Sequence, residues 1–114
     1  MGSFEDLEVW KRAVTLSADL YKGLRELRDY GFKDQLTRAG LSVASNIAEG
    51  MERESSADKA RHLTIARGSC GEVRTQIHIG IEIGYIDGEI GRRWIKESQE
   101  ISAMLVGLRR TLKP

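Results

Sequence analysis

The chain has 114 residues, of which 40% are hydrophobic and 31% charged, and it contains one proline. These proportions are typical of a folded protein with a hydrophobic core and exclude a disordered or fibrous chain, while so few prolines permit long helices. The formal net charge of +1 argues against the strongly basic surface that nucleic-acid-binding proteins usually carry. We therefore expect a single domain spanning residues 1–114.

No apolar run approaches the length of a membrane-spanning helix, about 18 residues. The acidic start FEDLE does not resemble a secretory signal. The single cysteine, Cys70, cannot form an intrachain disulfide, and a buried, reduced thiol is expected at its helical position. These features predict a cytoplasmic protein without a membrane partner.

The first helix is predicted over residues 5–28, because Glu5, Asp6 and Glu8 fall where the helix dipole favours negative charge. Turn-favouring residues follow it at positions 29–31. Helical spacing predicts a buried central ridge. It comprises Trp10, Val14, Ser17, Tyr21 and Leu24, and Ala13, Leu20 and Leu27 widen it into a broad buried stripe.

The second helix is predicted over residues 33–52 and carries two distinct faces. One face is an apolar ridge of Leu36, Gly40, Val43 and Ile47. The other lies about a third of a turn away and is polar. It comprises Gln35, Ser42, Asn46, Glu49 and Arg53. Packing into a hydrophobic core does not explain this polar face, so its residues are candidates for a functional role.

The third helix is predicted over residues 56–83, with Ser55 or Ser56 as N-cap and Asp58 as a capping-box partner. One buried ridge is expected from Leu63, Ala66, Cys70, Val73, Ile77 and Ile81. A second ridge has heptad spacing and comprises Ile65, Ser69, Glu72, Gln76, Ile79 and Ile83. Two such ridges provide more contact surface than one bundle can use.

The fourth helix is predicted over residues 89–112, after a glycine-containing turn at 84–88. Its apolar seam comprises Trp94, Ser98, Ile101, Leu105, Leu108 and Leu112. Four long helices joined by short turns predict an all-α protein, an antiparallel up-down-up-down four-helix bundle.

Four stretches of the sequence resemble the bacterial four-helix-bundle protein family. They are FEDLEVWKRAVTLSADLY, QLTRAGLSVASNIAEGMER, HLTIARGSCGEV and the weaker GYI. That family includes proteins encoded in intervening sequences of large-subunit ribosomal RNA genes and the accessory variability determinants of diversity-generating retroelements. The resemblance implies a subunit that assembles into a ring-like homopentamer. For the retroelement members it further implies binding to nucleic acid and to a reverse transcriptase, without catalysis by the bundle.

Six polar residues of the second and third predicted helices are candidates for a special role. They are Asn46, Glu49, Arg53, Arg67, Ser69 and Glu72. We expect them to form a buried or interfacial network, which holds the two helices together or one subunit against the next, rather than a ligand or catalytic site. Glu49 and Arg67 are the expected pair, because a guanidinium can engage a carboxylate bidentately.

Two groups of basic residues are candidate nucleic-acid contacts. Arg92, Arg93 and Lys96 form one, and Arg109, Arg110 and Lys113 form the other. We favour a solvated helix face as the explanation of the first group, and attraction to the dipole at a helix C-terminus as the explanation of the second. A ring of subunits would repeat a modest basic patch and gain avidity from the repetition.

Catalysis has little support in the sequence. His62 and His78 are too far apart along one helix to share a small site, and no Glu-x-x-His motif supplies ligands for a di-metal centre. Cys70 lies on the core ridge, which favours a structural thiol over a nucleophile. No catalytic residue, cofactor or metal is therefore expected.

The resulting functional hypothesis is a non-enzymatic, homo-oligomeric helical-bundle adaptor or scaffold whose principal partner is itself, with a pentamer favoured. The alternative is a nucleic-acid-binding accessory protein of the reverse-transcriptase-associated or ribosomal-RNA-intervening-sequence type. In that case the partners would be RNA or DNA and a protein such as a reverse transcriptase.

Overall fold

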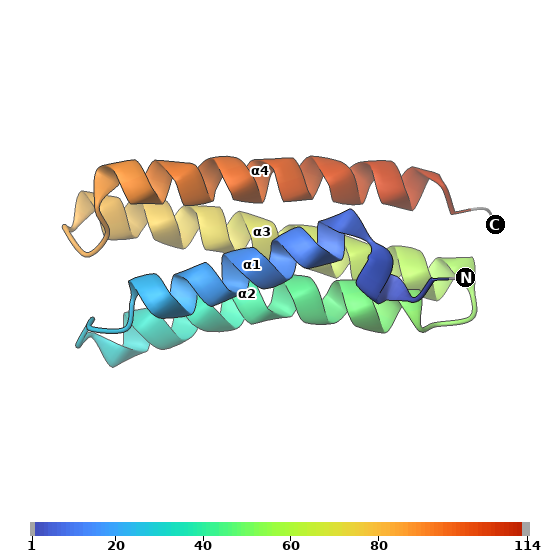
Figure 1. Cartoon of the computed structure of the whole chain (residues 1–114), viewed down its shortest axis with the longest axis horizontal. Coiled ribbons are helices and arrows are strands. Elements are labelled where there is room, and N and C mark those ends of the chain that lie inside the picture. The colour runs from blue at the N-terminus through green and yellow to red at the C-terminus, as the bar shows by residue number, and fades with distance from the viewer. Residues whose placement is uncertain (1, 113–114) are drawn as a thin grey trace.

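The computed structural model describes residues 2–112, which contain four α-helices (Figure 1). These are α1 (Glu8–Gly23), α2 (Tyr30–Met51), α3 (Ser56–Glu82) and α4 (Gly88–Arg110). Each helix packs on its neighbours along the chain, and α1 also packs on α4, which closes the bundle. The predicted all-α, antiparallel up-down-up-down four-helix bundle is confirmed. It measures 45 × 21 × 19 Å along its principal axes.

The first helix is shorter at both ends than predicted. A 3-10 turn, Phe4–Asp6, precedes it, and Leu7 is extended (φ −72°, ψ 128°), so the α-helix begins only at Glu8. It ends at Gly23, and Leu24 leaves the α-helical region and turns into the core, where it is 2% exposed. Leu24 is therefore buried, as the predicted ridge requires, although the α-helix has already ended.

The second helix begins three residues earlier than predicted, at Tyr30, because Asp29 caps it. One carboxylate oxygen of Asp29 accepts a hydrogen bond from the Phe32 backbone N–H at 3.1 Å. The other oxygen accepts from the Tyr85 hydroxyl at 2.8 Å, and the two bonds lower the pKa of Asp29. Asp29 thus ties the turn after α1 to the turn after α3, at the same end of the bundle (Figure 1).

The other two helices begin at side-chain caps. Ser55 Oγ accepts from the Asp58 backbone N–H at 3.1 Å, which confirms Ser55 as the N-cap of α3. Asp87 caps α4 by accepting from the Glu89 and Ile90 backbone N–H groups, both at 3.1 Å. The turn between α3 and α4 contains Gly84, whose φ of +81° lies in the left-handed region that favours glycine.

The core follows the predicted ridges on α2 and α3, whose central residues are buried. On α1 the prediction was partly wrong. Val14 and Tyr21, expected in the ridge, are 39% and 46% exposed. The core side of α1 comprises Val9, Ala13, Leu16, Ser17 and Leu20. The buried face is rotated because α1 packs against α4 as well as α2.

None of the helices between residues 2 and 112 is long and apolar enough to cross a membrane.

Candidate functional surfaces

A cluster of polar side chains spans the contact between α2 and α3. The Asn46 side-chain amide donates to the Ser42 carbonyl oxygen and hydroxyl, both at 3.0 Å. Ser69 Oγ donates to Ser42 Oγ at 2.8 Å, and Asn46 Oδ1 lies 3.1 Å from Nδ1 of His62. The structure therefore brings Asn46 and Ser69, both candidates from the sequence, into one hydrogen-bonded cluster.

His62 belongs to this cluster, and sequence analysis missed it. The side chain is buried, at 5% exposure. Because the Asn46 amide nitrogen is committed to the Ser42 carbonyl oxygen, Asn46 presents its oxygen to His62, and Nδ1 must therefore donate the hydrogen bond. The available signal was spacing, since His62 precedes Ser69 by seven residues and so lies on the same helix face.

Glu49 does not form the expected ion pair with Arg67. Its carboxylate pairs with Arg53, one turn along α2, at 2.7 Å and lies 3.9 Å from Nε2 of His62. Arg67 lines a cavity between α3 and α4 instead. It follows Leu63 by four residues on α3, which places it on the flank that packs against α4. Glu72 is exposed to solvent.

Three isoleucines of the second α3 ridge are exposed beside the polar cluster. Ile65, Ile79 and Ile83 are 41%, 47% and 52% exposed. Ser69 of the same ridge is buried, at 5% exposure, and bonds to α2. The ridge therefore contacts α2 in its middle and leaves apolar side chains uncovered on either side, two of them near the C-terminus of α3.

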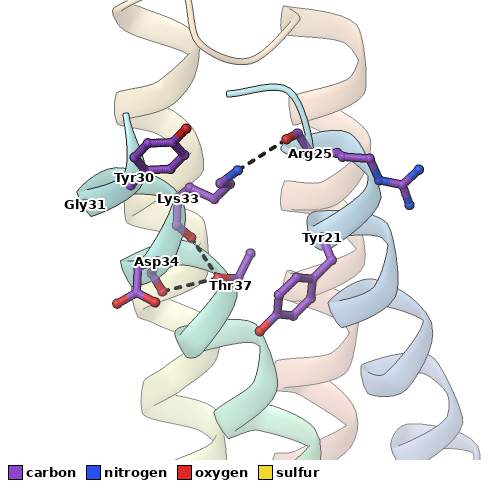
Figure 2. A pocket seen from close by; sticks show the side chains of 7 residues that line it. All are labelled: Tyr21, Arg25, Tyr30, Gly31, Lys33, Asp34 and Thr37. Carbon is purple, nitrogen blue, oxygen red and sulfur yellow. Dashed lines mark hydrogen bonds between the residues drawn. The ribbon is translucent and has the colours of Figure 1, made fainter. Parts of the chain in front are cut away.

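A groove of about 800 Å³ lies where α1 leads into α2 (Figure 2). Tyr21 of α1 and Tyr30 of α2 line it, and these two residues are 46% and 69% exposed. Leu41 lies one turn beyond Thr37 of the groove and is 45% exposed, so the uncovered apolar surface extends along α2.

The polar groups of this groove are mostly engaged with the protein. The Lys33 ammonium lies 5.2 Å from the centre of the Tyr30 ring and donates to the Arg25 carbonyl oxygen at 3.2 Å (Figure 2). Asp34 pairs with Arg38 at 2.8 Å. Thr37 donates to the Lys33 carbonyl oxygen at 2.8 Å. The charge left on the rim is positive, and the walls are aromatic.

The two basic groups occupy different environments. Arg93 lines a cavity together with Asp19 and Glu97. Arg92 and Lys96 are exposed. At the other end, Arg109 and Arg110 line the same cavity as Arg67. Lys113, the last member of the second group, lies outside the described residues.

Within residues 2–112, no group of three or more His, Cys, Asp or Glu side chains could hold a metal ion. Cys70 is fully buried, and burial raises the pKa of its thiol to about 11. The thiol is therefore protonated at neutral pH and a poor nucleophile.

The fold and these surfaces define an all-α four-helix-bundle protein whose distinguishing features lie on its helix faces. The chain belongs to the family of 23S rRNA-intervening sequence proteins, whose pattern matches residues 5–107. It is similar to a crystal structure of a protein of unknown function from the S23 ribosomal protein family of Bacteroides thetaiotaomicron. The two share 26% identity over 89% of this chain and 97% of the other, with a TM-score of 0.83. No curated protein is detectably similar.

Proposed function

We propose that the protein is a non-enzymatic, homo-oligomeric scaffold and that its copies associate through helix faces left uncovered in the single subunit. The main support for this proposal is that Ile79 and Ile83 of α3 are exposed. They lie at the same end of the bundle as the aromatic groove between α1 and α2. Isolated apolar side chains are common on protein surfaces. Two apolar surfaces at the same end of the bundle, however, favour association between copies.

The chemistry of the two surfaces is complementary. The isoleucines are accompanied by Glu72 and Glu82, both exposed, whereas the rim of the groove carries Arg25 and Lys33. An isoleucine ridge of one copy packed between Tyr21 and Tyr30 of the next would bury aliphatic against aromatic surface. It would also bring the glutamates close to the cations.

The placement of the surfaces favours a ring. The groove lies between α1 and α2, and the ridge lies on the α3 flank that faces α2, so they occupy neighbouring sides of the bundle. A contact between two different surfaces is heterologous, and it closes into a ring when the surfaces are suitably inclined. Surfaces on neighbouring rather than opposite sides of the bundle turn each copy relative to the last, which favours closure into a small ring over an open filament. A pentamer is the assembly we propose.

Light scattering on the purified protein tests this proposal. At a protein concentration on the order of tens of micromolar, the wild-type protein should have the mass of a ring rather than of a monomer. Ile79→Asp should dissociate it, because a buried unpaired charge strongly destabilises an interface. Ala103→Asp adds the same charge on an exposed position of α4 and should leave the mass unchanged. A monomeric wild-type protein would contradict the proposal.

A mixing experiment distinguishes a heterologous ring from a symmetric dimer. Ile79→Asp keeps an intact groove, and Tyr21→Asp keeps an intact ridge. Each variant alone should be monomeric, whereas an equimolar mixture should form a heterodimer through the one remaining pair of intact surfaces. A mixture that stays monomeric would show that ridge and groove do not bind each other.

A further inference from the structure

Three arginines line one cavity of about 390 Å³ on the flank between α3 and α4. They are Arg67 of α3 and Arg109 and Arg110 of α4. The remaining lining residues are Leu63, Thr64, Leu105 and Val106, so none of the seven is acidic. The Thr64 hydroxyl donates to the Ala60 carbonyl oxygen at 2.9 Å. The cavity therefore combines an apolar floor with concentrated positive charge.

Among the described residues, none of these three arginines forms an ion pair. Between residues 2 and 112, the arginines that form ion pairs are Arg12, Arg38 and Arg53. The dipole of α4 favours a cation at Arg109 and Arg110, which lie in its last turn. Arg67 has no such explanation, because it lies within the N-terminal half of α3. All three side chains are exposed at this cavity, so water weakens the repulsion between their like charges, and an anion bound between them would be attracted by all three.

We propose that Arg67, Arg109 and Arg110 form a binding site for a phosphate group. Guanidinium groups bind phosphate through paired hydrogen bonds, and three of them can surround its oxygens. Leu63, Leu105 and Val106 provide apolar surface beside the charges, which suits the organic part of a phosphate ester. The ligand is a phosphate group with a sugar attached, either in a free nucleotide or in a nucleic-acid strand.

The site is independent of the proposed assembly surfaces. It lies near the C-terminus of α4, whereas the groove lies at the opposite end of the bundle, at the turn between α1 and α2 (Figure 1). A variant in this cavity should therefore change phosphate binding and leave the mass of the assembly unaltered.

Calorimetric titration of the full-length protein tests the site with three probes: inorganic phosphate, adenosine monophosphate and a single-stranded RNA of about 12 nucleotides. Saturable binding of at least one probe, weakened by added salt, is expected. If the small probes bind, the source is a free phosphate compound. If the RNA alone binds, the source is a nucleic-acid strand. Absence of binding by all three at millimolar concentrations would overturn the site.

Arg67→Gln should raise the Kd of the bound probe about tenfold or more, because it removes one charge-assisted contact. Arg28→Gln is the matched control, since it removes the same charge from an exposed position in the turn at the other end of the bundle. An equal loss in both variants, or a change below about twofold for Arg67→Gln, would contradict the site. Dissociation of the assembly by Arg67→Gln would instead show that Arg67 lies in a contact between subunits and would overturn the proposal.

Discussion

The contact between α2 and α3 and the contact between α1 and α4 hold the bundle together by different means. Gly50 lets α3 approach α2 closely, and the cluster around Asn46 and His62 places hydrogen bonds inside this contact. The contact between α1 and α4 is held at its surface instead. Arg12 donates to Glu97 at 2.7 Å and also to Glu100, and the ring of Trp94 covers Gly23.

This difference indicates where each contact can tolerate change. A buried hydrogen bond must be kept, because an unpaired polar group without access to water costs more than the bond itself contributes. A partly exposed ion pair contributes little, because water replaces the lost partner. Changes in the α2–α3 contact should therefore have larger effects on stability than changes in the α1–α4 contact.

The largest effect is expected for Asn46→Ala. It leaves the Nδ1–H group of His62 buried without an acceptor, which should reduce the free energy of unfolding by about 1–3 kcal/mol. Urea denaturation at fixed protein concentration measures this change. Adding His62→Leu should cost less than the sum of the single changes. Strict additivity, or a loss below about 0.5 kcal/mol for Asn46→Ala, would contradict a buried polar lock.

A smaller effect is expected for Gly50→Ala, compared with Gly23→Ala. A Cβ atom at Gly50 would lie 2.8 Å from the His62 Cβ and 3.3 Å from the Lys59 carbonyl oxygen, so the helices themselves must move apart. Higher helix propensity offsets part of the cost, leaving a loss of about 1–2 kcal/mol.

At Gly23 the Cβ would meet the edge of the Trp94 ring at 2.5 Å, and this side chain can rotate away. Gly23→Ala should therefore cost less than Gly50→Ala. Gly68→Ala is the control, because no atom lies within 4 Å of its Cβ, and it should gain up to about 1 kcal/mol. Thermal denaturation ranks the three variants. A larger loss of stability for Gly23→Ala than for Gly50→Ala would contradict the conclusion that the α2–α3 contact is the less tolerant of the two.

The smallest effect is expected for Arg12→Ala, at most about 1 kcal/mol, because the Arg12 side chain is 28% exposed. The hydrogen bond from Arg12 lowers the pKa of Glu100. The contribution of this pair is therefore present above the pKa of glutamate in the unfolded chain and is lost as the pH falls through the lowered, folded-state value. Denaturation curves of wild-type protein and variant should converge at acidic pH and in high salt. A difference that persists under both conditions would indicate that Arg12 acts through packing.

Periodicity predicted the fold because the ridges of α2, α3 and α4 are regular and their turns are short. It failed at the ends of α1, where Leu7 is extended and Leu24 leaves the α-helical region although both stand within the predicted range. The early start of α2 was missed because Asp29 was assigned to a turn, although aspartate also caps helices.

The sequence identified candidate polar residues more reliably than it predicted which of them contact each other. Asn46 and Ser69 share a hydrogen-bonded cluster because their helix faces meet. Arg67 was assigned to the wrong neighbour, since its position on the flank of α3 depends on which side α4 occupies. Periodicity along one helix does not determine the order of helices around a bundle, and the grouping of Arg67 with Arg109 therefore required the structure.

The burial of Cys70 provides a way to observe the motion of the bundle. The thiol is 0% exposed, and the Cys70 carbonyl oxygen accepts a hydrogen bond from Ser98 of α4 at 3.1 Å. A thiol reagent can therefore reach the sulfur only while the surrounding helices are transiently apart. As the sequence contains one cysteine, each modified molecule records one such opening. The labelling rate then measures how often the interior becomes accessible, and no substitution is needed to introduce the reporting thiol.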